Sequence, residues 1–493
     1  MSSPSPWDLF REWSGTLTDI AGAAALSGWD RETLMPTAGS EGRARQLGTL
    51  AALHHRELVR ADAGDALAAL AEDDSLGPDE RAMVRLATRR RDRAVRLPES
   101  LVRDTSAACS RCVSAWLDAR HRDDFATYAG PLEAVLTLKR REAEALDTGT
   151  EPYDALLDEY EPGTRAADLE PVFADLRERL APLVEAASAR PPVLLPQREW
   201  STVGQVTLAR EIAEMVGFDR SGGVISCSEH PFTSSTHRGD VRFTTRVDPA
   251  SPISSISAVM HEVGHALYEQ GFPEHGDRTP LHDSPSLGAH ESQSRFWENQ
   301  VGRSQAFWLQ VEPLMRDHFP EAMSGIDHEL LHRAANVVRP SLIRVEADEV
   351  TYNLHIVLRF ELEVAMMRGD LPVADLPGAF SDGMHRLLGL RPGSDVEGAM
   401  QDIHWADGLF GYFPTYTLGN LYSGQLGAAA DEALGGVELA VEQGRFGDIL
   451  AFMRDRVHRH GARYPTPELM RRATGRELSA AALIAHLTRS HLH

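Results

Sequence analysis

The amino-acid sequence predicts a mainly helical protein with one small β-sheet. Apolar residues recur at intervals of three and four along most of the 493 residues, as they do in helices that bury one face. One segment, residues 240–247, instead alternates apolar and polar side chains as a half-buried strand does. No run approaches the ~18 consecutive apolar residues of a membrane-spanning helix. We therefore expect a large helical fold that is not embedded in a membrane.

The helical pattern is clearest after the turn at residues 161–164. A single apolar stripe there is formed by Leu169, Val172, Phe173, Leu176, Leu180 and Leu183, which are spaced as on one helix face. Comparable patterns cover residues 8–27, 78–95 and 132–146. The prolines near residues 191–192 and 249 indicate loops, and we find neither an internal repeat nor a low-complexity linker.

The strand pattern has one apolar face and one polar face. Val241, Phe243 and Val247 alternate with Asp240, Arg242, Thr244 and Arg246, so the first set is suited to a core and the second to a ligand. Helical patterning resumes near Ser255 and is interrupted by the Gly- and aromatic-rich residues 407–424. We expect one unit, residues 1–493, with a helical N-terminal half (about 1–200), a sheet (222–248), two central helices (255–305) and a helical C-terminal part (325–490).

Composition limits the possible partners and the compartment. The net charge of −23 and the lack of a basic cluster argue against nucleic acid. Residues 1–7 are rich in Ser and Pro, and no apolar signal segment follows them. Three cysteines fit a reducing compartment, so we expect a cytoplasmic protein. Cys109 and Cys112 form a C-x-x-C, but with no second pair and no βαβ pattern we expect no redox or metal role for them.

The residues most suggestive of chemistry are His261-Glu262-Val263-Gly264-His265, an H-E-x-x-H sequence. They lie in a predicted helix, residues 255–270, with a candidate N-cap at Ser254 or Ser255 and Gly271 beyond its end. At about 100° per residue, both histidines point away from the apolar stripe of this helix, one turn apart. The alternative is an ordinary pair of helix histidines, which would not require Glu262 between them. We therefore expect His261 and His265 to bind a metal ion.

A catalytic zinc site usually has three protein ligands and one open position. His290 and Glu291 open another predicted helix downstream, and only one of two adjacent residues can face the metal. The spacing alone leaves both as candidates for the third ligand. Zinc in such a site lowers the pKa of a water molecule, and Glu262 is placed to accept that water's proton as general base. The predicted reaction is therefore metal-assisted amide hydrolysis.

The sequence resembles the Taq-type metallocarboxypeptidase family over nearly its whole length. The H-E-x-x-H sequence and a D-x-R-x-T sequence at residues 240–244 are among the matching motifs, and the match at residues 290–293 makes Glu291 the third metal ligand. The resemblance is carried by residues 28–30, 35–36, 153–163, 230–232, 240–244, 261–265, 290–293, 343–349 and 398–405.

The resemblance implies a mainly helical fold with a deep central active-site groove, zinc as cofactor with Co²⁺ or Mn²⁺ possible, a homodimer and broad peptide specificity. On this basis we expect His404 and Tyr412 to assist catalysis at the developing oxyanion. Arg344 is our first candidate for holding the substrate carboxylate, because a guanidinium matches it bidentately. The expected substrate-binding residues are His230, Asp240, Arg242, Thr244, Arg344, Gln401 and Tyr416.

Each of these residues also has a purely structural interpretation. Arg242 could only pair with Asp240, Arg344 could pair with Asp348 on a solvated helix face, and His404 could be a core histidine. Alternative functions are an endo-acting oligopeptidase and a non-catalytic peptide- or metal-binding protein. A structural zinc scaffold is disfavoured, because neither a cysteine quartet nor a fourth protein ligand is evident.

Overall fold

The computed structural model describes residues 4–146, 149 and 151–492. The first three residues of the Ser/Pro-rich N-terminal segment lie outside this part. No helix among the described residues is long and apolar enough to cross a membrane.

The fold is mainly helical, as predicted. The N-terminal half contains α1 (Pro6–Thr33), α2 (Ser40–Leu58), α3 (Ala61–Ala71), α4 (Pro78–Arg96), α5 (Glu99–Arg122), α6 (Phe125–Leu146), α7 (Pro152–Tyr160), α8 (Ala166–Ser188) and α9 (Thr202–Met215). After the sheet follow α10 (Pro252–Gln270), α11 (Leu287–Arg295), α12 (Gln305–His318), α13 (His328–Ala335), α14 (Tyr352–Arg368) and α15 (Leu376–Leu388). The chain ends with α16 (Pro414–Leu434), α17 (Val437–Glu442), α18 (Phe446–Arg456), α19 (Thr466–Thr474) and α20 (Ala481–Leu492).

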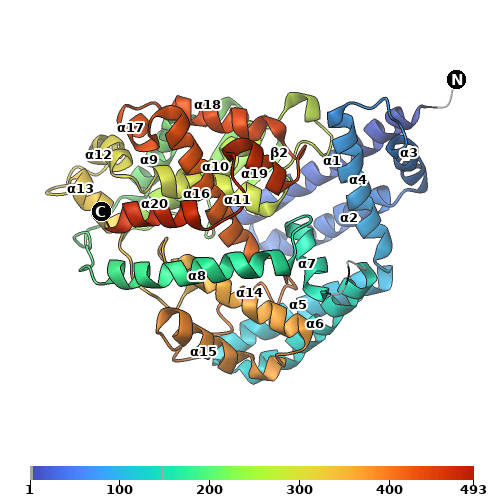
Figure 1. Ribbon diagram of the computed structural model, residues 1–493, viewed down its shortest axis with the longest axis horizontal. Helices are drawn as coiled ribbons and strands as arrows, with labels where there is room; N and C mark the ends of the chain where they lie inside the picture. The colour runs from blue at the N-terminus through green and yellow to red at the C-terminus, as the bar shows by residue number, and fades with distance from the viewer. Residues whose placement is uncertain (1–3, 147–148, 150, 493) are drawn as a thin grey trace.

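The helices are arranged around α8, which crosses the middle of Figure 1. Helices α16 and α20 lie above α8 in this view, whereas α14, α15, α5 and α6 lie below it. The N-terminal helices α1–α4 form the right-hand side. The stripe predicted for α8 faces the core: Leu176 and Leu180 are fully buried, and only Val172 in the stripe is partly exposed. Burial of this stripe fixes α8 between the upper and lower helices.

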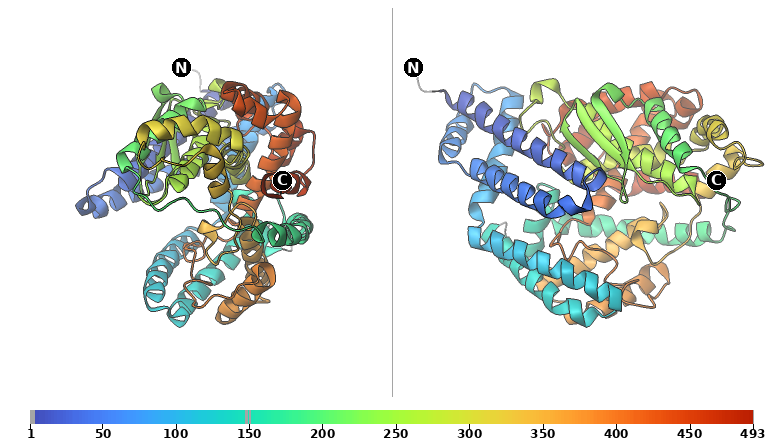
Figure 2. Two further views of the ribbon diagram at one scale, coloured as in Figure 1. Left: turned by 90° about the vertical axis from the view of Figure 1, so that its left-hand side faces the viewer. Right: turned by 180° about the vertical axis from the view of Figure 1, so that it is seen from behind.

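The small sheet has three strands, β1 (Gly223–Cys227), β2 (Thr233–His237) and β3 (Asp240–Thr245). The strand order is β1-β3-β2; β3 pairs parallel with β1 and antiparallel with β2. The reverse view in Figure 2 shows the sheet beside the blue helix α1. Val241 and Phe243 are fully buried, as the alternation predicted, whereas Val247 lies beyond the end of β3.

Two apolar clusters stabilise the fold. The larger one extends through α5–α20 and the sheet. The smaller one joins α1, α3 and α4 around Phe10, Trp13 and Leu67, and it includes Leu281 from the segment between α10 and α11. Leu281 therefore connects the N-terminal helices to the segment between the two helices that carry the predicted metal ligands.

Two helix starts differ from the sequence predictions. Helix α10 begins at Pro252 with Ser251 as N-cap, not at Ser254 or Ser255, because Pro252 occupies the first turn, where no amide donor is needed. Helix α16 begins at Pro414, inside the region predicted to interrupt the helices. Its glycines at 419 and 424 do not break the helix. They permit close contact instead, since an added Cβ would lie 2.4 Å from Glu291 Cγ and 2.8 Å from Leu483 Cα, respectively.

Candidate metal centre

Helix α10 presents His261 and His265 on one face, one turn apart. The opposite face is the predicted apolar stripe, and it is buried at Ile256, Val259 and Val263. The two imidazole rings meet edge to face with centroids 5.0 Å apart. Burial of the stripe therefore fixes the direction in which both histidines point.

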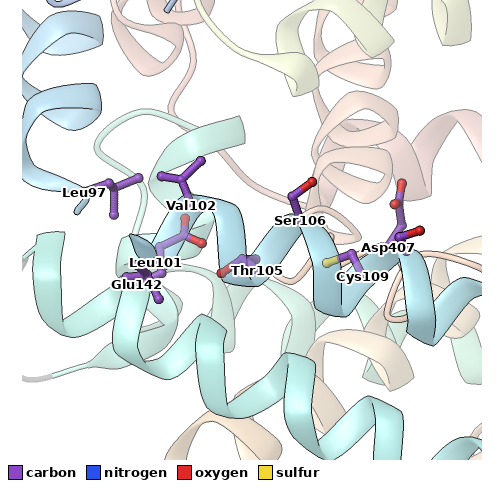
Figure 3. Close-up of a pocket in the computed structure, with 9 residues that line it drawn as sticks. Leu97, Leu101, Val102, Thr105, Ser106, Cys109, Glu142 and Asp407 are labelled. Carbon is purple, nitrogen blue, oxygen red and sulfur yellow. The ribbon is translucent and has the colours of Figure 1, made fainter. Parts of the chain in front are cut away.

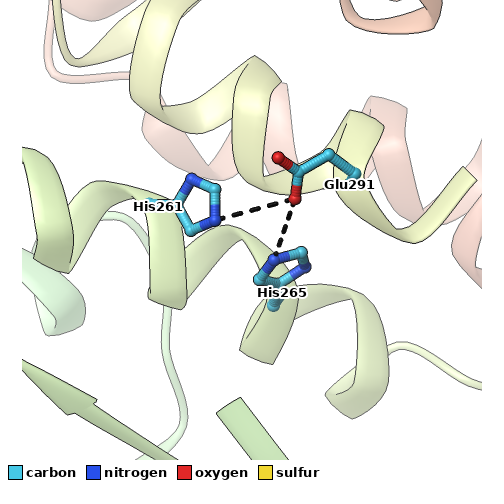
Figure 4. Close-up of side chains that lie close together, drawn as sticks. All are labelled: His261, His265 and Glu291. Carbon is cyan, nitrogen blue, oxygen red and sulfur yellow. Dashed lines mark ion pairs between the residues drawn. The ribbon is translucent and has the colours of Figure 1, made fainter. Parts of the chain in front are cut away.

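Helix α11 brings Glu291 to the same point, as Figure 4 shows. Glu291 Oε2 lies 3.6 Å from His261 Nε2 and 3.4 Å from His265 Nε2. The three side chains could hold a metal ion, since one ligand atom from each lies within 4.8 Å of the others. Ligand atoms about 2.1 Å from a tetrahedral zinc ion are about 3.4 Å apart. The two distances from Glu291 match this spacing, and two imidazoles with one carboxylate are a donor set that suits zinc.

Close contact between backbones sets the position of Glu291. A Cβ at Gly264 of α10 would lie 2.6 Å from the carbonyl oxygen of Gln293 on α11. Gly419 of α16 contacts the side chain of Glu291 from the other side. Larger side chains at either glycine would clash with these neighbours, so Gly264 lets α11 approach α10 and Gly419 lets α16 approach α11. This close contact explains why glycine occupies the second x position of the H-E-x-x-H sequence, residue 264.

A second layer of charged groups holds the candidate ligands. Arg295 Nε donates to Glu291 Oε1 at 2.7 Å, which leaves Oε2 directed at the histidines. Glu298 Oε2 lies 2.9 Å from His261 Nδ1 and 3.1 Å from Arg295 Nη1. The π-helix Phe296–Val301 follows α11 directly and carries Glu298, and such segments are frequent at functional sites.

The charges of this layer determine which atoms are free to bind metal. Burial opposes ionisation of Glu298, but Arg295 and His261 lower its pKa to about 2. An ionised Glu298 accepts a hydrogen bond from His261 Nδ1–H, and His261 Nε2 faces Glu291. Burial also opposes a charge on His261, yet Glu291 and Glu298 raise its pKa to about 9. Burial and the neighbouring His290 lower the pKa of His265 to about 4. Metal binding therefore has to displace one proton from His261.

Glu262, the predicted general base, is buried next to this cluster and points to the sheet side. Thr233 Oγ1 of β2 donates to Glu262 Oε2 at 2.7 Å. Burial raises the pKa of Glu262 above its ordinary value, and the neighbouring His261 partly opposes this shift. A raised carboxyl pKa is what a group that takes up a proton near neutral pH requires.

His290, the competing candidate for the third ligand, has a different partner. Its Nε2 lies 2.9 Å from Glu269 Oε1, and its ring stacks on His265 with centroids 4.5 Å apart. The geometry therefore brings Glu291, and not His290, to the two histidines of α10. His290 instead packs behind His265.

The two residues expected to assist at the oxyanion, His404 and Tyr412, lie in the loop of residues 402–413 that precedes α16, close to Tyr416 of that helix. His404 Nε2 is 3.3 Å from the hydroxyl of Tyr416, and the rings of His404 and Tyr412 have centroids 5.5 Å apart. Burial lowers the pKa of His404 to about 4, so its ring is neutral near pH 7. The Glu291 carboxylate contributes to the raised pKa of Tyr412, after burial.

Arg344 does not lie on a solvated helix face, and Asp348 is not its ion-pair partner. It is buried, and its Nε and Nη2 donate to Asp402 Oδ1 at 3.0 and 2.8 Å. Arg359 Nε donates to the other oxygen of Asp402 at 2.7 Å. The cluster of two arginines and one aspartate therefore has a net positive charge. Gln401 braces the backbone beside it, accepting from Arg344 N and donating to the carbonyl of Leu342.

The predicted polar face of the sheet is less open than expected. Arg242 pairs with Asp240 at 2.7 Å, which is its structural interpretation, and lies over the Trp29 ring of α1. Thr244 is fully buried, and its hydroxyl lies 2.6 Å from that of Ser228. The 228–232 segment covers Thr244, whose backbone N–H donates to the carbonyl of Phe232, so this member of the polar face is not open to a ligand. His230 is exposed.

The C-x-x-C pair lies on α5, where a cavity of about 510 Å³ opens beside Cys109 (Figure 3). The cavity is lined by Cys109 and by Asp407 of the 402–413 loop. Both cysteines are free and buried; burial raises the pKa of Cys109 and raises that of Cys112 to about 12. Reactive or metal-binding thiols require the opposite shift, so this pair has no sign of such a role.

Sequence reasoning missed Thr233, Glu269, Arg295 and Glu298. Arg295 and Glu298 follow Glu291 at helical spacing, which is the one feature that could have indicated them. Thr233 and Glu269 gave no such indication, since their contacts depend on how the sheet and α10 pack.

A helical fold with two histidines of an H-E-x-x-H helix facing a glutamate from a second helix defines a metallopeptidase type of site. The chain matches the model of the carboxypeptidase Taq (M32) metallopeptidase family over residues 10–491. The chain therefore belongs to this family, whose members are metal-dependent carboxypeptidases.

Similar proteins support this assignment over the full length. A thermostable carboxypeptidase 1 of Thermus thermophilus is 41% identical over 508 residues, covering 100% of this chain and 99% of that protein. Carboxypeptidase 1 of Bacillus subtilis is 35% identical, covering 95% and 94% of the two chains. The crystal structure of an M32 carboxypeptidase from Deinococcus radiodurans superposes with a TM-score of 0.96 at 39% identity, covering 99% and 98% of the chains.

Proposed function

We propose that this metallocarboxypeptidase removes residues one at a time from the C-termini of peptides with broad specificity, using zinc held by His261, His265 and Glu291. The convergence of these three side chains at zinc-ligand spacing is the observation that carries the proposal. Zinc is preferred because two imidazoles and one carboxylate are a common catalytic zinc set. Co²⁺ and Mn²⁺ remain possible occupants of the same donor set.

When bound, the ion would supply Lewis-acid polarisation of the scissile carbonyl and a lowered pKa for the attacking water. The other roles belong to side chains of the protein. Glu262 accepts the water's proton and returns it to the leaving amine. Thr233 holds the Glu262 carboxylate in place through its 2.7 Å hydrogen bond. Burial raises the pKa of Glu262, which suits a carboxylate that first takes a proton from water and then gives it to the leaving amine.

Tyr412 and His404 are proposed to donate hydrogen bonds to the carbonyl oxygen as it gains negative charge. His404 can donate from one nitrogen only, because burial keeps its ring neutral. Its Nδ1 is buried, so Nε2 is the nitrogen that would donate to the substrate oxygen. The Tyr416 hydroxyl, 3.3 Å from Nε2, is the neighbour that orients this side of the ring. The two donors then come from the loop and its junction with α16.

The substrate carboxylate is proposed to bind near Arg344. Asp402 accepts from both Arg344 and Arg359, so one of the two positive charges is not neutralised within the cluster. Arg344 Nη1 also donates to the Tyr352 hydroxyl at 3.1 Å. His230, Asp240, Arg242, Gln401 and Tyr416 remain proposed peptide-binding residues, whereas buried Thr244 would act only through its neighbours.

Amidation of the substrate tests this assignment. An amide lacks the charge that the Arg344 cluster attracts, and a hydrogen bond to a charged group contributes about 1.5–3 kcal/mol. The wild-type kcat/KM should therefore be roughly ten- to a hundredfold higher for a free acid than for the matched amide. In Arg344→Ala, cleavage of the acid should be poor and this ratio should shrink towards one.

The control is the same pair of peptides with Arg242→Ala, whose guanidinium is already paired with Asp240. If the ratio shrinks there and persists in Arg344→Ala, Arg242 holds the carboxylate and Arg344 is structural. Arg246 is the next candidate cation if neither variant changes the ratio. Equal cleavage of acid and amide at internal bonds would instead identify an endo-acting oligopeptidase.

A non-catalytic peptide- or metal-binding protein is the remaining alternative. It gives no reason for a buried glutamate beside the candidate ligands with a hydrogen bond from Thr233. We further propose a homodimer in the cytoplasm. The family resemblance supports the dimer, and three free cysteines support a reducing compartment.

A further inference from the structure

The 402–413 loop carries the two proposed oxyanion donors near its opposite ends. His404 lies in the first limb of the loop and Tyr412 in the second. Their rings nevertheless come within 5.5 Å of each other, because the loop folds back on itself. A loop has no regular ladder of backbone hydrogen bonds, so a fixed separation of its two limbs requires contacts with side chains from other elements.

Glu363 of α14 contacts both limbs. Its Oε1 accepts from Trp405 Nε1 at 2.8 Å, next to His404 in the chain. Its Oε2 accepts from the backbone N–H of Gly411 at 3.1 Å, next to Tyr412. Each oxygen of one carboxylate therefore holds one limb. The Tyr153 hydroxyl of α7 also donates to Oε2, at 2.7 Å.

The surroundings make this arrangement stiff and specific. Glu363 is fully buried, so its hydrogen bonds do not compete with water. Its three partners are all donors, which suits a carboxylate that only accepts and does not suit an amide. Gly411 has a φ of 87°, and a Cβ there would lie 2.7 Å from Leu157 N of α7. The second limb is thus pressed against α7 while Glu363 holds the first limb to it.

We propose that Glu363 is a positioning residue that fixes the separation of His404 and Tyr412, so that both donors reach the same substrate oxygen. This inference rests on the proposed function, in which these two residues act on the substrate. A displacement of about 1 Å at such donors can cost as much as a hundredfold in rate. Glu363 itself is not proposed to contact substrate or metal.

The chain offers a matched control. Tyr153→Phe removes one hydrogen bond to Glu363 from α7 and leaves both bonds to the loop. Glu363→Gln replaces one acceptor oxygen by an NH₂ donor. This donor then faces either Trp405 Nε1–H or the Gly411 N–H, so the hydrogen bond to one limb is lost. A purely structural role predicts similar consequences for both variants. A positioning role predicts a loss of turnover in Glu363→Gln only.

We expect Glu363→Gln to lower kcat by about ten- to a hundredfold with KM within about threefold and metal content unchanged. Tyr153→Phe should lower Tm but keep kcat within about twofold of the wild type. Trp405→Phe frees only Oε1, and it carries the same expectation if Glu363→Gln does not fold. Equal kcat losses in Tyr153→Phe and Glu363→Gln would overturn the proposal.

Two further measurements separate this inference from the proposed function. In a Tyr412→Phe background, Glu363→Gln should cost clearly less than in the wild type, because both act through one donor; multiplicative losses would contradict the inference. A crystal structure of Glu363→Gln should show the His404–Tyr412 ring separation changed from 5.5 Å. An unchanged separation would overturn the inference, whereas a wild type without carboxypeptidase activity would overturn the proposed function.

Discussion

Glu262→Gln should retain its metal and lose nearly all activity. Glutamine has nearly the same shape and can still accept the hydrogen bond from Thr233, but it cannot take a proton from water. Loss of a general base alone costs about 10² to 10⁴ in rate. None of the three candidate ligands is altered, so metal content should stay at the wild-type value. Turnover and metal content have to be measured on the same preparation.

Glu269→Gln is the matched control for this variant. Glu269 is a second buried glutamate on α10, and its carboxylate contacts His290 and not the candidate metal ligands. Its substitution should cost far less turnover than that of Glu262. Near-wild-type activity in metal-replete Glu262→Gln would refute the assigned base while leaving the ligand set untouched.

Alanine at His261, His265 or Glu291 should abolish activity by removing the metal. Each is one of the three proposed protein ligands, and a site with two ligands left binds zinc weakly. His290→Ala should keep its metal, because the His290 Nε2 is directed at Glu269 and not at the cluster. Metal content after dialysis, with turnover before and after addition of zinc, measures the effect.

The comparison between neighbours on α11 is the decisive part of this experiment. His290 and Glu291 are adjacent on the same helix and each contacts a side chain of α10, so general destabilisation should affect both variants. If His290→Ala lost the metal and Glu291→Ala kept it, the third ligand would be wrong although the hydrolase assignment would survive.

The candidate metal ligands on α10 could be predicted because their relative position is set by the helix itself. Two histidines four residues apart on an amphipathic helix must share a face, and this requires no knowledge of the tertiary structure. Whether His290 or Glu291 completed the set could not be decided from spacing, since it depends on how α11 rotates against α10. The close contact at Gly264 sets that rotation.

The substrate side was less predictable because its contacts join distant segments. Arg344 was expected to hold the substrate carboxylate or, as the alternative, to pair with Asp348; its ion pair within the protein is with Asp402, on a separate loop. The alternation in β3 correctly identified Val241 and Phe243 as core residues. It could not show that the 228–232 segment would bury Thr244 on the other face. A strand pattern gives the two faces and does not say what covers each.

Glu363 shows the same limit. A single glutamate in a buried helix gives no pattern in the sequence, and its three partners come from α7 and from both limbs of a loop. Its importance follows only from the joint position of these partners.

Mass spectrometry of a mixed peptide digest tests the central claim most directly. The zinc-loaded wild-type protein should shorten free-acid peptides from the C-terminus in single-residue steps, and the ladder should disappear after dialysis against a chelator and return with zinc. Internal fragments without a C-terminal ladder, or a ladder that persists in the metal-free protein, would contradict the account.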